Sequence, residues 1–262
     1  MKYITSKKNN IFKQLVKLDE SPKNRKISGL TILDGIHLIN FYYEKIGLPE
    51  CLFINESGLK NPEVIGLISL VQNTAVKIYI LNDKLFCSIS PVKTPTGVIA
   101  LIRIPALNNI ILNKKKNFSV LLESIQDPGN LGSILRSAAA AGASDIYMSP
   151  DCADAWSPKV LRAAMGAHFL LHIYERSKLI EISKEFKGAV IATTVKHVKS
   201  LYALSLQGPV AFMFGNEGTG LSKMLYQTAN EKINIPMPGK TNSLNVASTA
   251  AICFFERVRQ LQ

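Results

Sequence analysis

The sequence has few cysteines and histidines, and their spacing does not suggest a metal or redox site. No CxxC pair is present, and widely spaced thiols favour reduced, structural cysteines over zinc ligands or disulfides. His168 and His172 have the i, i+4 spacing of a zinc pair, but no third ligand accompanies them. We therefore expect no metal. The cysteines are Cys51, Cys87, Cys152 and Cys253.

Long hydrophobic runs are also missing. The longest apolar stretches, residues 65–71 and 246–255, are short or contain polar residues, whereas a spanning helix needs roughly 20 apolar residues. The opening sequence MKYITSKKNN has no apolar segment of the kind found in signal peptides. The sequence thus predicts a cytoplasmic protein with no membrane segment.

Acidic residues are outnumbered: 31 Lys and Arg stand against 19 Asp and Glu, which gives a net charge of +12. Half of this charge lies in residues 1–26, because eight basic side chains there face only Asp19 and Glu20. Such a cluster is either a solvated tail or a surface that contacts nucleic-acid phosphates, and we favour the second. The basic residues are Lys2, Lys7, Lys8, Lys13, Lys17, Lys23, Arg25 and Lys26.

The 262 residues suffice for two modest domains. We expect a small α/β domain over 1–105, a linker over 106–117 that contains Lys114–Lys116, and a second domain over 118–262. In the first domain, the patterns predict helices at 9–18, 36–46 and 62–71 and strands at 30–33, 51–54, 76–81 and 97–104.

The second domain alternates apolar strands with helical segments. Strands are expected at 119–122, 145–148, 189–193, 210–214 and 232–235. This order is typical of a Rossmann-like parallel sheet covered on both faces, whose ligand crevice lies at the carboxyl ends of the strands.

Three polar, glycine-rich clusters follow such strands. In the first, DPGNLGSILR, we consider Asn130 either an N-cap or a site residue, and Arg136 either a buried ion-pair partner or an anion binder facing the crevice. The second, GNEGTG at 215–220, lacks the order GxGxxG, and Glu217 in its middle would repel phosphate. A plain turn in which Asn216 and Glu217 cap the next helix is the alternative to a ligand loop. In the third, IPMPGKTNSLNVA, Ser243 is either an N-cap or a site residue.

In this order, NLGSILR, FGNEGTGLS and IPMPGKTNSLNVA resemble the three signature motifs of the SpoU or TrmH family of RNA 2′-O-ribose methyltransferases. The resemblance covers about residues 118–262 and includes the segment 157–167. Ser137 stands where Thr is common in the family, and Ala164 and Ala247 where Ser is common. Residues 1–105 resemble the small RNA-binding domain, similar to ribosomal protein L30 and L7Ae, that many members place in front.

The resemblance implies a deep trefoil knot in the second domain, a homodimer with sites near the subunit interface, and S-adenosyl-L-methionine as cofactor. The substrate would be RNA, ribosomal RNA in preference to transfer RNA; a non-catalytic, ribosome-associated RNA-binding protein is the alternative. The polar active-site set would comprise Asn130, Arg136, Glu217, Ser243 and Asn245. Cofactor contacts would come from Thr193, Gly215, Asn216, Glu217, Ile235, Met237 and Leu244.

The chemistry suggests a role for Arg136. A ribose hydroxyl is a poor nucleophile, so methyl transfer needs this oxygen held in line with the methyl group and its developing charge stabilised. A guanidinium is too basic to act as a general base at neutral pH. We therefore expect Arg136 to position phosphate and stabilise the alkoxide.

Overall fold

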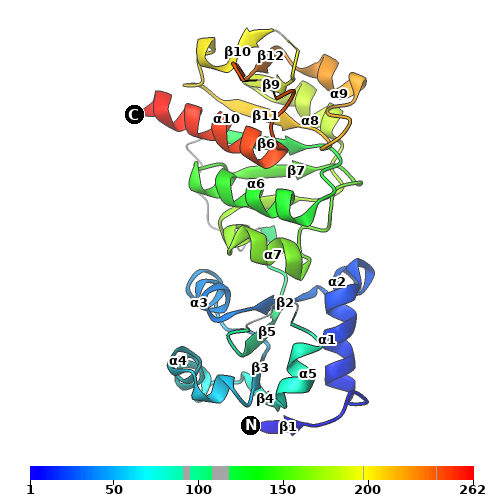
Figure 1. Ribbon diagram of the computed structural model, residues 1–262, viewed down its shortest axis with the longest axis vertical. Helices are drawn as coiled ribbons and strands as arrows, with labels where there is room; N and C mark the ends of the chain where they lie inside the picture. Colours follow the sequence, from blue (N-terminus) through cyan, green and yellow to red (C-terminus); the bar gives the residue numbers. More distant parts are fainter. Residues whose placement is uncertain (91–94, 108–117, 197, 240) are drawn as a thin grey trace. The chain divides into compact units, whose positions relative to one another are not determined.

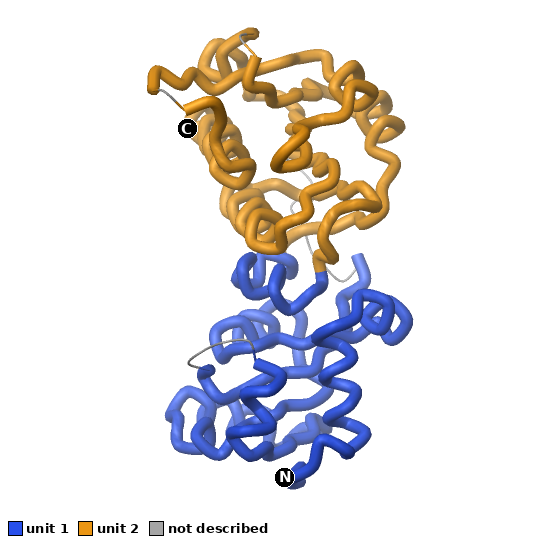
Figure 2. The backbone as a smooth tube through the Cα atoms, turned by 45° about the vertical axis from the view of Figure 1, so that its right-hand side comes forward, with its two compact units in different colours: residues 1–109, 156–169 blue, residues 110–155, 170–262 orange. Residues whose placement is uncertain are grey.

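The computed structural model describes residues 1–90, 95–107, 118–196, 198–239 and 241–262 of the chain. Two compact units are present, and neither is a single stretch of sequence (Figure 2). Unit 1 comprises residues 1–109 and 156–169, and unit 2 comprises residues 110–155 and 170–262. Most of the expected linker, including Lys114–Lys116, lies outside the described residues.

Unit 1 contains a five-stranded mixed sheet of strand order β1-β4-β3-β5-β2 (Figure 1). β1 and β3 run parallel to β4, and β5 lies antiparallel between β3 and β2. The strands are β1 (Lys2–Ile4), β2 (Leu30–Asp34), β3 (Cys51–Asn55), β4 (Lys77–Leu81) and β5 (Val98–Arg103). The sequence patterns predicted all of these except the three-residue β1.

Helix α1 (Asn10–Glu20) provides much of the core of unit 1. Asn9 caps it by accepting from the amides of Ile11 and Phe12. Its apolar face, Phe12, Leu15 and Leu18, is buried in one cluster with residues of the sheet. The other helices are α2 (Pro22–Ser28), α3 (Ile36–Lys45), α4 (Pro62–Val71) and α5 (Asp83–Cys87), with a 3-10 turn η1 (Gly58–Lys60).

The segment 156–169 completes unit 1 although it follows two strands of unit 2 in sequence. It holds α7 (Pro158–Ala164), and the 3-10 turn η3 (Ala167–Leu170) begins in it. The Thr31 hydroxyl of β2 donates to the Trp156 carbonyl at 2.7 Å. Arg162 pairs with the buried Asp34 at 3.0 Å, so two polar contacts fix the segment to β2.

Unit 2 contains a seven-stranded sheet of order β10-β12-β9-β11-β6-β7-β8, in which every neighbouring pair is parallel. This confirms the predicted parallel α/β fold. The short strands β8 and β10 were not among the strands predicted from the sequence. The strands are β6 (Phe118–Leu122), β7 (Asp145–Met148), β8 (His172–Tyr174), β9 (Ala189–Thr193), β10 (Lys199–Ser200), β11 (Val210–Phe214) and β12 (Glu231–Asn234).

Helices cover both faces of this sheet (Figure 1). α6 (Pro128–Ala140) and α10 (Val246–Leu261) pack side by side on one face, where Phe212 and Phe214 of β11 contact the ring of Phe254. The alternate residues Ala211 and Met213 face a cluster on the other side, which includes residues of α8 (Leu179–Glu185) and α9 (Lys223–Thr228). A 3-10 turn η4 (Leu201–Ala203) follows β10. Among the described residues, no helix is long and apolar enough to cross a membrane.

Three helix starts differ from the local alternatives that the sequence offered. α6 is capped by Asp127, with Pro128 in its first turn, so Asn130 is not the N-cap. α10 is capped by Asn245, not Ser243. α9 is capped by Ser222, so Asn216 and Glu217 are not its caps either. In each case a better-placed oxygen nearby accepts from the free amides of the first turn.

Candidate active site

A chain of hydrogen bonds joins the three polar clusters. The Asn245 side-chain amide donates to Asn130 Oδ1 at 2.9 Å, and Asn130 Nδ2 donates to Glu217 Oε1 at 3.1 Å. The three residues come from the start of α10, the first turn of α6 and the loop after β11. Because β6 and β11 are parallel neighbours, these clusters meet at the carboxyl ends of the strands, as predicted.

Glu217 is held as a carboxylate. Besides Asn130, it accepts from the main-chain amides of Gln126 and Asp127 at 3.3 and 3.1 Å. Partial desolvation raises its pKa, but the hydrogen bonds from Asn130 and these amides outweigh it, so the pKa lies below the ordinary glutamate value. Its oxygens are engaged with donors around the start of α6, which makes Glu217 an organiser of the site rather than a free base.

Asn216 shapes the loop in front of Glu217. Its Nδ2 donates to the Ser124 carbonyl at 2.9 Å, and its Oδ1 accepts from the amides of Gly218 and Thr219. The main chains of Asn216 and Gly220 also pair with each other. The side chain of Asn216 therefore fixes the conformation of the loop 215–220, whose main chain lines a possible ligand site.

Gly215 cannot be replaced without moving this loop. A Cβ atom at Gly215 would lie 2.2 Å from the carbonyl carbon of Gly220 and 2.3 Å from the nitrogen of Leu221. These are main-chain atoms, so no side-chain rotation relieves the clash. Only glycine at position 215, directly after β11, therefore allows the main chain of Gly220 and Leu221 to come so close.

A cavity of about 1000 Å³ opens beside the loop. Its walls come from the ends of β9, β11 and β12 and from the start of α10. All seven predicted cofactor residues line it, as does Ser243. The seven predicted cofactor residues are Thr193, Gly215, Asn216, Glu217, Ile235, Met237 and Leu244.

Arg136 lies apart from this arrangement. Among the described residues its side chain forms no hydrogen bond or ion pair, and this side chain is exposed and does not line the cavity. Six positions separate it from Asn130, which places the two on different faces of α6. The interpretation of Arg136 as a buried ion-pair partner is wrong.

Comparisons with known proteins show to which family the chain belongs. Residues 117–255 match the model described as the SpoU rRNA Methylase family. The chain belongs to the SpoU rRNA methylase family. Residues 9–100 match an MRM3-like substrate binding domain. As a member, the chain is an RNA 2′-O-ribose methyltransferase that uses S-adenosylmethionine, which confirms the resemblance of its motifs.

Relatives cover the whole of this SpoU methylase. It is 31% identical to an uncharacterized tRNA/rRNA methyltransferase of Synechocystis, over 98% of this chain and 93% of that protein. It is 27% identical to the 23S rRNA (guanosine(2553)-2′-O)-methyltransferase RlmP of Bacillus subtilis, over 97% and 98% of the two chains. An AdoMet-bound rRNA methyltransferase from Sinorhizobium meliloti has 27% identity and a TM-score of 0.83, over 100% and 98% of the chains.

The cavity suits the cofactor in size and lining. A volume of about 1000 Å³ is at the upper end for small-molecule sites. Phe214, Ile235 and Leu244 give it apolar walls, and the loop beside Gly215 supplies main-chain groups. This combination fits a ligand with a flat apolar ring and many hydrogen-bonding edges.

Sequence reasoning missed part of the cavity lining. Thr194, Val195 and Lys196 follow β9 directly, and Ile233 lies in β12. The rule that sites lie at strand ends points to 194–196 as much as to Thr193, so this signal was present. The contributions of Val246 and Thr249, in the first turn of α10, depend on how the helix packs and had no local signal.

Proposed function

We propose that this SpoU methylase modifies a guanosine of large-subunit ribosomal RNA. The relatives RlmP and RlmB are named as 23S rRNA guanosine 2′-O-methyltransferases, and they match over at least 86% of this chain. The substrate-binding domain match over residues 9–100 and the lysines of α1 and α2 support RNA binding by this part of the chain. We also place the enzyme in the cytoplasm, where the substrates of its bacterial relatives are made.

The domain limits in sequence are our proposal as well: an RNA-binding domain over 1–105, a linker over 106–117 and a methyltransferase domain over 118–262, of which residues 156–169 belong to unit 1 in the fold. The family trefoil knot belongs to the last of these. The match of two separate family models, over 9–100 and 117–255, supports this division.

The cavity beside Gly215 is the cofactor pocket in this proposal. Thr193, Gly215, Asn216, Glu217, Ile235, Met237 and Leu244 hold the cofactor there, largely through main-chain groups. When bound, S-adenosylmethionine supplies a methyl group on a positively charged sulfur. Phe214 and Ile233 exclude water from the apolar part of the pocket.

The polar chain from Asn245 through Asn130 to Glu217 is the observation that best supports the active site. It borders the cofactor pocket and fixes the start of α6 against the loop 215–220. In our proposal these side chains and Ser243 orient the target ribose. The 2′-oxygen would take the methyl group as the carbon–sulfur bond of the cofactor breaks and the sulfur leaves as a neutral thioether, and the hydroxyl proton would go to water or an RNA phosphate.

Arg136 acts on the substrate in this mechanism. Its guanidinium is exposed and unpaired among the described residues, so it is available to hold the phosphate beside the target ribose and stabilise charge on the 2′-oxygen. Because it lies away from the pocket of its own chain, we propose that it serves the pocket of a partner subunit.

A homodimer would bring Arg136 of one subunit to the pocket of the other. The exposed strip of α6 around Arg136 consists of the small residues Gly129, Ser133 and Ala140. On α10, which packs beside α6, Phe255 is 49% exposed. Small residues allow close helix approach, and an exposed aromatic ring favours burial in an interface.

The pocket assignment is tested with Gly215→Val. The added side chain would displace the loop, so calorimetry should detect no S-adenosylmethionine binding while the parental protein binds.

Labelled methyl transfer to ribosomal RNA from a strain lacking the gene, followed by mapping of 2′-O-methyl positions, identifies the substrate. Transfer only to transfer RNA, or no transfer to RNA at all, would contradict the proposed function.

A further inference from the structure

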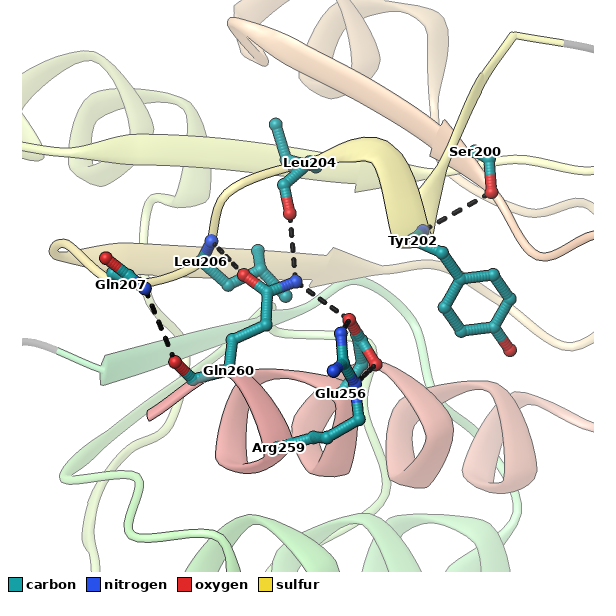
Figure 3. A network of polar contacts seen from close by, with 8 residues as sticks. All are labelled: Ser200, Tyr202, Leu204, Leu206, Gln207, Glu256, Arg259 and Gln260. Carbon is teal, nitrogen blue, oxygen red and sulfur yellow. Dashed lines mark hydrogen bonds and ion pairs between the residues drawn. The ribbon is translucent and has the colours of Figure 1, made fainter. Parts of the chain in front are cut away.

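The last turns of α10 form a polar network with a segment far away in sequence (Figure 3). Gln260 Oε1 accepts from the Leu206 amide at 2.8 Å, and Gln260 Nε2 donates to the Leu204 carbonyl at 3.0 Å. The same Nε2 donates to Glu256 Oε1 at 2.8 Å. We call Glu256, Gln260 and the main chain of Leu204 and Leu206 the clasp.

The clasp is well ordered by its surroundings. Glu256 is only 7% exposed, and both its oxygens accept from Arg259 at 2.8 Å. The hydrogen bonds from Arg259, with that from Gln260, lower the pKa of Glu256 to about 2, so it remains an acceptor for Gln260 at neutral pH. The side chains of Leu204 and Leu206 are buried.

The segment held by the clasp belongs to a connection that begins in the cofactor pocket. Thr193, Thr194, Val195 and Lys196 line the pocket at its start. β10 then pairs with β12, where Lys199 lies opposite the pocket residue Ile233. The described part of the connection therefore has a pocket wall at one end and the clasp at the other.

α10 itself forms another wall of the same pocket. Val246 and Thr249 line the pocket from its first turn, and Asn245 donates to Asn130. This helix of 16 residues is about 24 Å long, so the clasp lies at the end of α10 remote from the pocket. The clasp thus ties the far end of this helix to the connection whose first residues form another part of the pocket wall.

We propose that Gln260 and Glu256 are positioning residues for cofactor binding. Neither residue lines the pocket. By joining α10 to residues 204–206, they fix the separation between the pocket walls at 193–196 and 246–249. This inference rests on the proposed cofactor pocket.

The test is Gln260→Met, which keeps the apolar stem and removes the clasp hydrogen bonds. Calorimetry should show S-adenosylmethionine affinity weakened by about tenfold, equivalent to about 1.4 kcal/mol. The kcat at saturating cofactor should stay within about twofold of the parental value, since the reacting groups are unchanged. Gln262→Met is the matched control, because Gln262 is the same residue type at the exposed end of α10 and its side chain forms no hydrogen bond within the described residues; its affinity should be parental.

Hydrogen exchange on the parental enzyme tests the inference without a variant. If the clasp and the pocket are coupled, cofactor binding must stabilise the clasp in return, so the Leu206 amide should exchange more slowly with S-adenosylmethionine present. Parental affinity in Gln260→Met, or unchanged exchange at Leu206, overturns the proposal. If Gly215→Val still binds the cofactor, the pocket assignment itself has failed instead.

Discussion

At the scale of single residues, the site depends on side chains that organise main chain. Asn216 and Glu217 together engage main-chain groups on the loop 215–220 and around the start of α6. Their residue types alone suggested capping or catalysis. The carboxylate oxygens of Glu217 accept hydrogen bonds from the start of α6, so the main contribution of Glu217 is to hold the loop 215–220 against that helix.

Glu217 makes stability depend on pH in a defined direction. Its pKa in the folded protein lies below the ordinary value of 4.5, so its stabilising effect is full above that value and is lost as the pH falls through the lower folded pKa. Glu217→Gln should therefore lower the Tm at pH 7, and the difference from the parental protein should shrink below about pH 4.5.

Thermal unfolding between pH 7 and the acid range measures this difference. Glu185→Gln is the control, because the Glu185 side chain is exposed and forms no hydrogen bond within the described residues. A Tm difference for Glu217→Gln that is the same at all pH values would contradict the role of the ionised carboxylate.

At the scale of elements, α1 and α2 combine a structural face with a basic one. Seven of the eight basic residues in 1–26 are exposed lysines, whereas Arg25 is buried and donates to the carbonyls of Leu18 and Asp19. Phe12, Leu15 and Leu18 lie in the core of unit 1. Removing the segment would therefore destroy the domain, so its charge must be tested by substitution.

Lys13→Gln with Lys17→Gln removes two charges one helical turn apart on the exposed face of α1. If these lysines contact phosphates, RNA affinity should fall and the slope of log K against log salt should decrease by roughly one unit for each contact. Filter binding over a salt series measures the slope. Lys178→Gln with Lys184→Gln is the control in unit 2, and equal effects of both pairs would return the α1 lysines to a solubilising role.

The sequence predicted the long elements and missed the short ones. Strands such as 51–55 and 210–214 are buried and apolar, so their pattern is strong. β1 and β10 have three and two residues, too few for any periodicity. The local pattern could not locate the caps of α6 and α10, because each start offers two suitable side chains.

At the scale of the whole molecule, the proposed homodimer makes a prediction about shared sites. Arg136→Ala and Gly215→Val should each be inactive. In a mixed dimer, however, the intact pocket of one subunit can receive Arg136 of the other. Equal mixing with subunit exchange should recover about one quarter of the parental methyl transfer, because half the dimers are mixed and each has one complete site.

Initial rates of labelled methyl transfer after co-refolding or co-expression measure this recovery. Gel filtration confirms that both variants form dimers. The control mixes Arg136→Ala with parental protein, which should give the activity expected from simple dilution of complete sites. An inactive mixture of two dimeric variants would place Arg136 at the pocket of its own chain.

The discontinuous makeup of unit 1 could not be predicted from the sequence. The resemblance of residues 157–167 to the family segment between two motifs favoured a place in the methyltransferase domain. Arg162 is instead paired with Asp34, and the Trp156 carbonyl accepts from Thr31. Only the folded chain brings these positions together, more than 120 residues apart.

Because unit 1 is built from two segments of sequence, it limits which chimeras of related enzymes can fold. A chimera that takes residues 1–105 from one relative and the rest from another would combine a foreign β2 with a native 156–169, and the partner of Asp34 would then come from the wrong parent. Asp34 and Arg162 must therefore come from the same parent. Transplanting the whole of unit 1 between relatives therefore requires two segments of sequence.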